Sequence, residues 1–318
     1  MNYKSNIPNY IIVLSTMNSG GGAIYDYLSA RGDLHDPLKG SEYQLPQMPN
    51  GLMTLEAAAG NAFHPGTSDF ALTQFEDAVG KLLRSHTIWK PGRGFINKLK
   101  LFEEAVNDFI QEISVINYPM HLEWHRLMRS PIQHFLSLIK DRFHIEEKIL
   151  NTRILVSKEY LVKAAQKMHD KIFILNSSGT PVLLDQAGSG WNPIESTKYF
   201  FNRKIILVTR DPRDQFVFMK INKKAHSLNG FIHWYKEMQF RLESIKDPIL
   251  INIKFEDFII KHGVMTDIIC NHLSINSNKK SSYNPKNSKK NIGKYKDFLS
   301  KIEINEIERN LSDFISFE

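Results

Sequence analysis

The sequence IIVLSTMNSGGGAIYDYLS, residues 11–29, passes from apolar, β-branched residues through three consecutive glycines to a segment with helical spacing. Residues 10–15 predict a buried strand, and Ile24 and Leu28 share one face of a helix predicted over 23–30. Glycine costs backbone entropy here, so the bend needs a physical reason. One reason is a tight turn with close helix–sheet packing. The other is an anion bound by backbone N–H groups at the positive end of the helix dipole. The local sequence leaves both open.

Composition and charge are those of an ordinary globular chain with a basic balance. The 318 residues are 42% hydrophobic and 24% charged, which is enough for a large core. The single cysteine, Cys270, excludes an intramolecular disulfide and fits a reducing compartment. The start MNYKSNIPNY is a poor signal peptide, and no stretch approaches the roughly 20 apolar residues that span a bilayer. We therefore expect a cytoplasmic protein without a membrane span.

The second half of the chain alternates strands and helices. Strands are predicted at 180–186 and 204–209, and ILINIKFEDFI, residues 249–259, predicts a further strand that leads into a helix. This alternation predicts an α/β fold with a central, mainly parallel sheet and helices on both faces. Residues from about 45 to 150 are less regular. We expect them to form a largely helical insertion within a single domain that spans residues 1–318.

The stretch KIILVTRDPRDQ, residues 204–215, places Arg210 at the carboxyl end of a predicted strand. Open α/β sheets bind ligands at that edge, and arginine holds phosphate through paired N–H donors. Asp211 or Asp214 would hold the arginines in place or cap the helix that starts near Pro212. The alternative interpretation is a cluster of ion pairs that caps this helix and only stabilises packing.

The positive charge is concentrated late in the chain. Of a net charge of +7, much lies in KKSSYNPKNSKKNIGKYK, residues 279–296, which has no acidic residue. Such a segment is a solvated loop or a basic clamp over an anionic partner. Aromatic residues are sparse within it, and no nucleic-acid-binding motif is present, so we do not expect nucleic acid as the partner.

The glycine loop differs from the common nucleotide loops. It lacks the lysine and hydroxyl of GxxxxGKS/T and the spacing of GxGxxG, which disfavours ordinary ATP hydrolysis and NAD binding. His121 and His125 have the spacing of metal ligands on a helix, but no HExxH glutamate accompanies them and no third ligand is evident. We expect no metal site.

In their order along the chain, these segments resemble the nucleotide-dependent sulfotransferase family. The matching features are the strand–glycine loop–helix, RDPRD after a later strand, KFEDFI, and the lysine-rich loop that runs into NIGKYKDFL. The resemblance covers about the first thirty residues and much of the chain after Thr180. It implies a P-loop-like fold and the co-substrate 3′-phosphoadenosine 5′-phosphosulfate (PAPS). It also implies a small-molecule or saccharide acceptor that receives the sulfuryl group on a hydroxyl or amine, with the insertion over about 45–150 on the acceptor side.

The resemblance also implies which residues bind the nucleotide. The first loop holds the 5′-phosphosulfate, which on this chain means Asn18, Ser19, Gly20, Gly21, Gly22 and Ala23. The later arginine and the late loop hold the 3′-phosphate, which means Arg210, Lys289, Lys290, Asn291, Ile292 and Gly293.

Two positions depart from the family pattern. Asn18 stands where many members carry Lys or Arg to polarise the leaving group, and Phe218 stands where a serine commonly contacts the 3′-phosphate. Arg213 or Lys220 would compensate at the second position.

Sulfuryl transfer needs a group that takes the proton of the acceptor, and two residues are candidates. Glu42 in LKGSEYQLP is similar to the catalytic glutamate of Golgi-type relatives, and we prefer it. His64 in NAFHPG is the second candidate, because cytosolic relatives use a histidine. Asp185, at the end of a predicted strand, would lie at the ligand edge and contact the acceptor.

Two other functions stay open. A strand that ends in aspartate is also what a P-loop small-molecule kinase needs to organise Mg²⁺. A non-catalytic nucleotide-binding protein of the same fold would tolerate Asn18 and Phe218.

Overall fold

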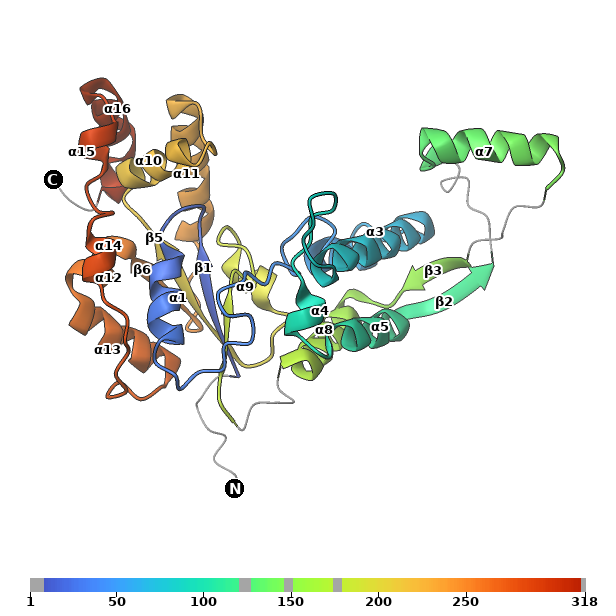
Figure 1. Ribbon diagram of the computed structural model, residues 1–318, viewed down its shortest axis with the longest axis horizontal. Coiled ribbons are helices and arrows are strands. Elements are labelled where there is room, and N and C mark those ends of the chain that lie inside the picture. Colours follow the sequence, from blue (N-terminus) through green and yellow to red (C-terminus); the bar gives the residue numbers. More distant parts are fainter. Residues whose placement is uncertain (1–8, 120–126, 146–150, 174–178, 316–318) are drawn as a thin grey trace. The chain divides into compact units, whose positions relative to one another are not determined.

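The computed structural model describes residues 9–119, 127–145, 151–173 and 179–315 (Figure 1). It divides into two compact units, Met1–Gln47 with Phe173–Glu318, and Met48–Ile172. The second unit contains most of the segment that the sequence marks as an insertion. That the chain forms one domain with an insertion over about 45–150 stays a prediction.

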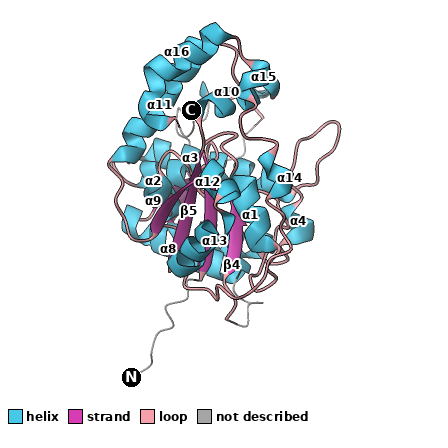
Figure 2. Ribbon diagram, turned by 90° about the vertical axis from the view of Figure 1, so that its left-hand side faces the viewer, coloured by secondary structure: helices cyan, strands magenta, loops and turns pink. Residues whose placement is uncertain are grey.

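The first unit is built on a four-stranded parallel sheet with the order β4-β1-β5-β6 (Figure 2). Along the central strand, Val13 lies opposite Asp185 and Ser15 lies opposite Val208, so β4, β1 and β5 end at the same edge. The α/β class and the parallel sheet are confirmed. The strands are β1 Tyr10–Ser15, β4 Val182–Asp185, β5 Arg203–Thr209 and β6 Leu250–Lys254.

Helices surround this sheet, and their starts follow local chemistry. Gly20, in the left-handed region at φ 94°, precedes α1, which begins two residues earlier than predicted. Helix α10 begins at Pro212 as expected, and the Asp211 side chain caps it by accepting from the Arg213 amide. The helices are α1 Gly21–Ser29, α9 Pro193–Thr197, α10 Pro212–Ile221, α11 Leu228–Glu243, α12 Phe255–Ile260, α13 His262–Leu273, α14 Lys286–Lys289, α15 Tyr295–Phe298 and α16 Lys301–Leu311, followed by a 3-10 turn at Ser312–Phe314.

Both faces of the sheet are buried, which explains why its strands read as nearly continuous apolar runs. On one face, alternate strand residues pack with α1, α12 and α13 in a single core. On the other face, the Tyr10 ring contacts Phe200 and Phe173, with centroid separations of 5.1 and 6.3 Å. This core fixes the carboxyl edge of the sheet, where the candidate site lies.

The second unit is mainly helical, with one antiparallel strand pair. Strand β2 pairs with β3, a strand that the sequence did not predict. Arg153 on β3 forms an ion pair with Glu76 at 2.6 Å, which ties the strand to α3. His121 and His125, which the sequence places at the spacing of metal ligands, lie outside the described residues. The elements are α2 Leu52–Ala59, α3 Pro65–Leu83, α4 Phe95–Lys98, α5 Phe102–Ile113, β2 Ser114–Pro119, α7 Pro131–Arg142, β3 Asn151–Leu155 and α8 Lys158–Phe173.

None of the helices in the described ranges combines the length and the apolar character that crossing a bilayer requires.

Candidate functional site

The loop between β1 and α1 is held in one conformation by side chains from its own ends and from α10. The Ser19 hydroxyl donates to the Val208 carbonyl at 2.6 Å and accepts from the Thr16 amide at 3.0 Å. The Gln215 side-chain amide donates to the Met17 carbonyl at 2.8 Å and to the Thr16 carbonyl. The loop is therefore pre-formed against the end of β5.

The three glycines have different structural reasons. A Cβ at Gly20 would lie 2.4 Å from the ring of Phe255, and one at Gly21 would lie 2.8 Å from the Ser15 Cβ. A Cβ at Gly22 would meet nothing within 4 Å. Close packing thus accounts for the first two glycines but not for the third. No side chain caps α1 and its first turn has no acid, so this helix start keeps its partial positive charge.

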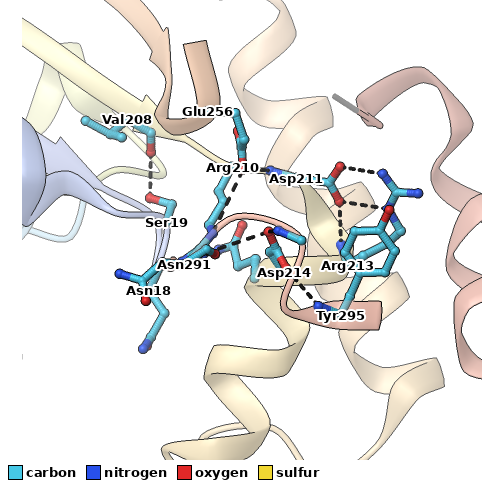
Figure 3. A network of polar contacts seen from close by, with 12 residues as sticks. Asn18, Ser19, Val208, Arg210, Asp211, Arg213, Asp214, Glu256, Asn291 and Tyr295 are labelled. Carbon is cyan, nitrogen blue, oxygen red and sulfur yellow. Dashed lines mark hydrogen bonds and ion pairs between the residues drawn. The ribbon is translucent and has the colours of Figure 1, made fainter. Parts of the chain in front are cut away.

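Arg210 joins the glycine loop to the late basic loop (Figure 3). Its guanidinium donates to the Asn18 carbonyl at 3.4 Å and to the Asn291 carbonyl. The guanidinium carbon lies 4.2 Å from the ring centroid of Phe218 and 4.8 Å from that of Phe255. Segments from the two ends of the chain therefore converge on one side chain at the carboxyl end of β5.

Arg210 is also a buried cation, with only 4% of its surface exposed. Burial lowers its pKa, and the charges of Asp214, Glu256 and Asp211 oppose this effect. Glu256 lies 3.9 Å from the guanidinium and accepts from the Asp211 amide at 3.0 Å. The pKa of Glu256 is raised from 4.5 to about 7, because the effect of burial exceeds the opposing effects of hydrogen bonds from backbone amides and of the Arg210 charge. The charge of buried Arg210 and the charges of Asp214, Glu256 and Asp211 therefore compensate one another.

The late loop is held by its backbone. Asp214 accepts from the Gly293 amide at 2.7 Å and from the Tyr295 amide at 3.0 Å, so the Gly293 donor is directed at α10 (Figure 3). Ile292 packs against the core, whereas Lys289 and Lys290 are exposed. Their ammonium groups are accessible to an anionic ligand.

The predicted compensating residues are engaged elsewhere. Arg213 binds both oxygens of Asp211, at 3.1 and 2.8 Å, and also pairs with Glu308 at 2.5 Å. Lys220 pairs with Glu303 at 2.9 Å. Arg213 and Asp211 thus form the ion pair and helix cap that the alternative interpretation of RDPRD predicted.

Two lysines that were not predicted from the sequence lie beside Asn18 and Phe218, the two positions that depart from the family pattern. The Lys224 ammonium donates to the Asn18 side-chain oxygen at 3.1 Å. The Lys294 ammonium lies 4.8 Å from the ring centroid of Phe218, the ring that Arg210 also contacts. Lys294 belongs to the basic segment 279–296, so its charge could have been noted from the sequence. Lys224 follows α10 and belongs to no motif.

The candidate proton acceptors are in different units. Glu42 is in the first unit, where its charge helps to raise the pKa of Asp185. His64 is in the second unit, where its Nδ1 accepts from the Gly66 amide at 3.1 Å at the start of α3. Over the described residues, no group of three or more His, Cys, Asp or Glu side chains has an arrangement that could hold a metal ion.

Comparisons of the sequence and of the structure with known proteins give different results. No protein-family profile matches the sequence, and a search of curated proteins finds no match. Among solved structures, the chain is similar to a sulfotransferase domain from the curacin biosynthetic pathway, with 15% identity and a TM-score of 0.44 over 96% of this chain and 98% of that one. It is similar to the sulfotransferase domain of the Synechococcus PCC 7002 olefin synthase, with 12% identity and a TM-score of 0.43 over 98% and 97%. A Mycobacterium tuberculosis sulfotransferase has 10% identity and a TM-score of 0.35 over 85% and 68%.

Proposed function

We propose that this protein is a sulfotransferase that moves the sulfuryl group of PAPS to a hydroxyl or amine of a small-molecule or saccharide acceptor. One observation carries the proposal: the Arg210 guanidinium contacts both the Asn18 carbonyl and the Asn291 carbonyl. PAPS has anionic groups on the 3′ and 5′ oxygens of one ribose, so it needs two cationic sites in one region. The glycine loop and the late basic loop supply two such sites.

The 5′ end of the nucleotide fits the start of α1. Residues Asn18 to Gly22 provide backbone donors at the positive end of the helix, whereas the Ala23 amide donates to the Gly20 carbonyl at 3.1 Å. Gly22 leaves open space there. Sulfuryl transfer leaves negative charge on the 5′-phosphate, and catalysis depends on donors aimed at that charge. Lys224, hydrogen-bonded to Asn18, supplies the cation that the loop itself lacks.

The 3′-phosphate fits the region around Phe218. Arg210 and Lys294 both contact this ring, so two positive charges lie at the position where relatives carry a serine. Lys289 and Lys290, from the same loop as Asn291, Ile292 and Gly293, add exposed ammonium groups. In this arrangement Arg210 contributes charge and holds the two loops together.

The sequence proposes Glu42 or His64 as the proton acceptor, and Glu42 is in the unit that contains the glycine loop.

The test uses 3′-phosphoadenosine 5′-phosphate (PAP), the desulfated product, and two matched glycine variants. Gly22 and Gly263 are each the second residue of a helix, and a Cβ at either would meet nothing within 4 Å. Both Gly22→Leu and Gly263→Leu should therefore fold. PAP should raise the Tm of the wild type and of Gly263→Leu. At a hundredfold excess over Kd, the bound ligand adds about 2.7 kcal/mol to the free energy of unfolding. It should not raise the Tm of Gly22→Leu, because the leucine blocks the anion.

Two results would contradict the proposal: a wild-type Tm that millimolar PAP does not change, or a full shift in Gly22→Leu. The neutral residue at Asn18 favours a second candidate, a protein that binds the nucleotide without catalysis. That candidate predicts a PAP shift with no transfer of radiolabelled sulfate from PAPS to any acceptor. A P-loop kinase predicts instead a shift that requires Mg²⁺ and ATP.

A further inference from the structure

Asp185 lies at the edge of the sheet where the glycine loop begins. It ends β4, opposite Val13 of β1, and its carbonyl accepts from the Tyr43 amide at 2.8 Å. The next residue, Gln186, accepts from the Ser15 amide at 3.4 Å and donates to the Ser15 hydroxyl. The backbone of Asp185 is thus fixed beside the last residue before the loop.

One oxygen of this carboxyl group has no hydrogen-bond donor. Oδ1 is buried, and nothing in the part of the chain that the structure describes donates to it. A buried acceptor without a donor costs free energy, as does a buried charge without a counter-ion. Packing gives no reason to keep an aspartate at this position, whereas a proton-transfer role does.

The groups that face Asp185 are acidic. They are Glu42 from the segment after α1, Asp26 and Tyr25 from α1, and Asp36. The pKa of Asp185 is raised from 3.8 to about 7, chiefly by burial and also by the charges of Glu42, Asp26 and Asp36, while the Gln186 amide lowers it. The carboxyl group therefore changes its protonation state near neutral pH.

The segment that carries Glu42 is tied to α1 and to β4. Asp36 accepts from the Tyr25 hydroxyl at 2.6 Å and from the Ser29 hydroxyl at 2.7 Å. The Tyr25 hydroxyl in turn accepts from the Gly40 amide at 3.2 Å. The Tyr43 amide, directly after Glu42, donates to Asp185. These bonds hold the Glu42 charge close to the Asp185 carboxyl.

We propose that Asp185 takes the proton of the acceptor during sulfuryl transfer, and that Glu42 is a positioning residue that acts through Asp185. This proposal rests on the proposed function. The acceptor oxygen or nitrogen forms a bond to sulfur as the bond from sulfur to the bridging oxygen of PAPS breaks. The electron pair of the broken bond stays on that oxygen in PAP, and the acceptor proton moves to the Asp185 carboxylate. Water then removes it from the neutral acid.

The site suits this step because a general base works best with a pKa near the operating pH. An ordinary exposed aspartate would hold a proton too weakly. The Glu42 carboxylate, which accepts from the Gln44 side-chain amide at 2.6 Å, increases the proton affinity of its neighbour.

Two measurements test the proposal. In protein labelled with ¹³C at aspartate carboxyl groups, NMR should show an Asp185 pKa close to 7 in the wild type and a lower one in Glu42→Gln. Transfer of radiolabelled sulfate from PAPS, to water and to the small molecules of a cell extract, should fall by about 10²- to 10⁴-fold in Asp185→Asn. PAP should still raise the Tm of this variant. In Glu42→Gln, the acid limb of the rate profile should move to lower pH while transfer persists.

Several results would overturn the inference. One is transfer at the wild-type rate by Asp185→Asn, and another is an Asp185 pKa near the ordinary value of 3.8. A third is complete loss of transfer in Glu42→Gln with the Asp185 pKa unchanged, which would make Glu42 the base. If the wild type binds PAP but transfers sulfate to neither water nor extract at any pH, Asp185 has no catalytic role. A wild type that binds no PAP would overturn the proposed function as well.

Discussion

Replacing Asp185 with asparagine should stabilise the protein, and the gain should grow as pH rises. The folded-state pKa of Asp185 is raised from 3.8 to about 7, chiefly by burial. Between these values the folded chain binds a proton that the unfolded chain has released. The stability that this proton contributes is complete below the unfolded pKa and is lost as pH rises through the folded pKa. Asparagine has no such proton to lose.

The size of the effect follows from the two pKa values. One pKa unit corresponds to about 1.4 kcal/mol, so the gain in the free energy of unfolding should rise by about that amount per pH unit between about pH 4 and 7. Above about pH 7 it should level off near 4 kcal/mol, which is an upper bound. Between pH 5 and pH 8 the expected increase is about 2 to 3 kcal/mol.

The assay is urea unfolding at a series of pH values, followed by tryptophan fluorescence. Trp191 and Trp234 report on the first unit, where their ring centroids are 5.5 Å apart. Glu243→Gln removes an exposed carboxylate and is the matched control, with no pH-dependent gain expected. A gain for Asp185→Asn that is equal at pH 5 and pH 8 would refute the reasoning, because the carboxyl would then titrate as it does in water.

Three further substitutions separate structural from functional roles in the candidate site. Arg210→Ala leaves the buried acids Asp214 and Glu256 without their cation, so urea unfolding should show a loss of about 3 to 5 kcal/mol; a loss below 1 kcal/mol would contradict the buried network. Lys224→Met, at an exposed site, should change the free energy of unfolding by less than about 0.5 kcal/mol but lower sulfate transfer from PAPS about 10²-fold. Unaltered transfer would remove Lys224 from the mechanism. Gly20→Ala, at φ 94° and against an aromatic ring, should cost about 1 to 3 kcal/mol in the same unfolding assay, and a neutral result would be inconsistent with that backbone.

The elements that the sequence predicted well are those whose signals are local. Strand β1 has the predicted bounds, and β5 begins one residue before the predicted 204–209, because fully buried parallel strands are continuous apolar runs with polar flanks. The start of α10 follows from Pro212, whose missing N–H costs nothing at the first helical position.

The second unit shows where local signals end. Strand β3 has the sequence NTRIL, with polar residues that indicate no buried face. It forms because it pairs with β2, and because its backbone is held from α3. The Leu155 amide donates to the Ser68 hydroxyl, and the Arg153 amide donates to Asp69, at 2.8 and 2.9 Å. Those partners lie 87 and 84 residues away, so a short window of sequence cannot reveal them.

In the candidate site, too, some residues could be predicted from local sequence and others depend on distant parts of the chain. The glycine loop and Arg210 could be named from motifs, but the charges beside Asn18 and Phe218 could not. From motifs alone, a cation that compensates for Phe218 can be sought only in the same segment, which is why Arg213 and Lys220 were predicted. In the structure, both of these side chains form ion pairs with carboxylates. The cation beside Asn18 instead comes from Lys224, 206 residues along the chain. A leaving group requires positive charge at a place in space, so a neutral residue in the motif argues against catalysis only if no other element brings a cation to that place.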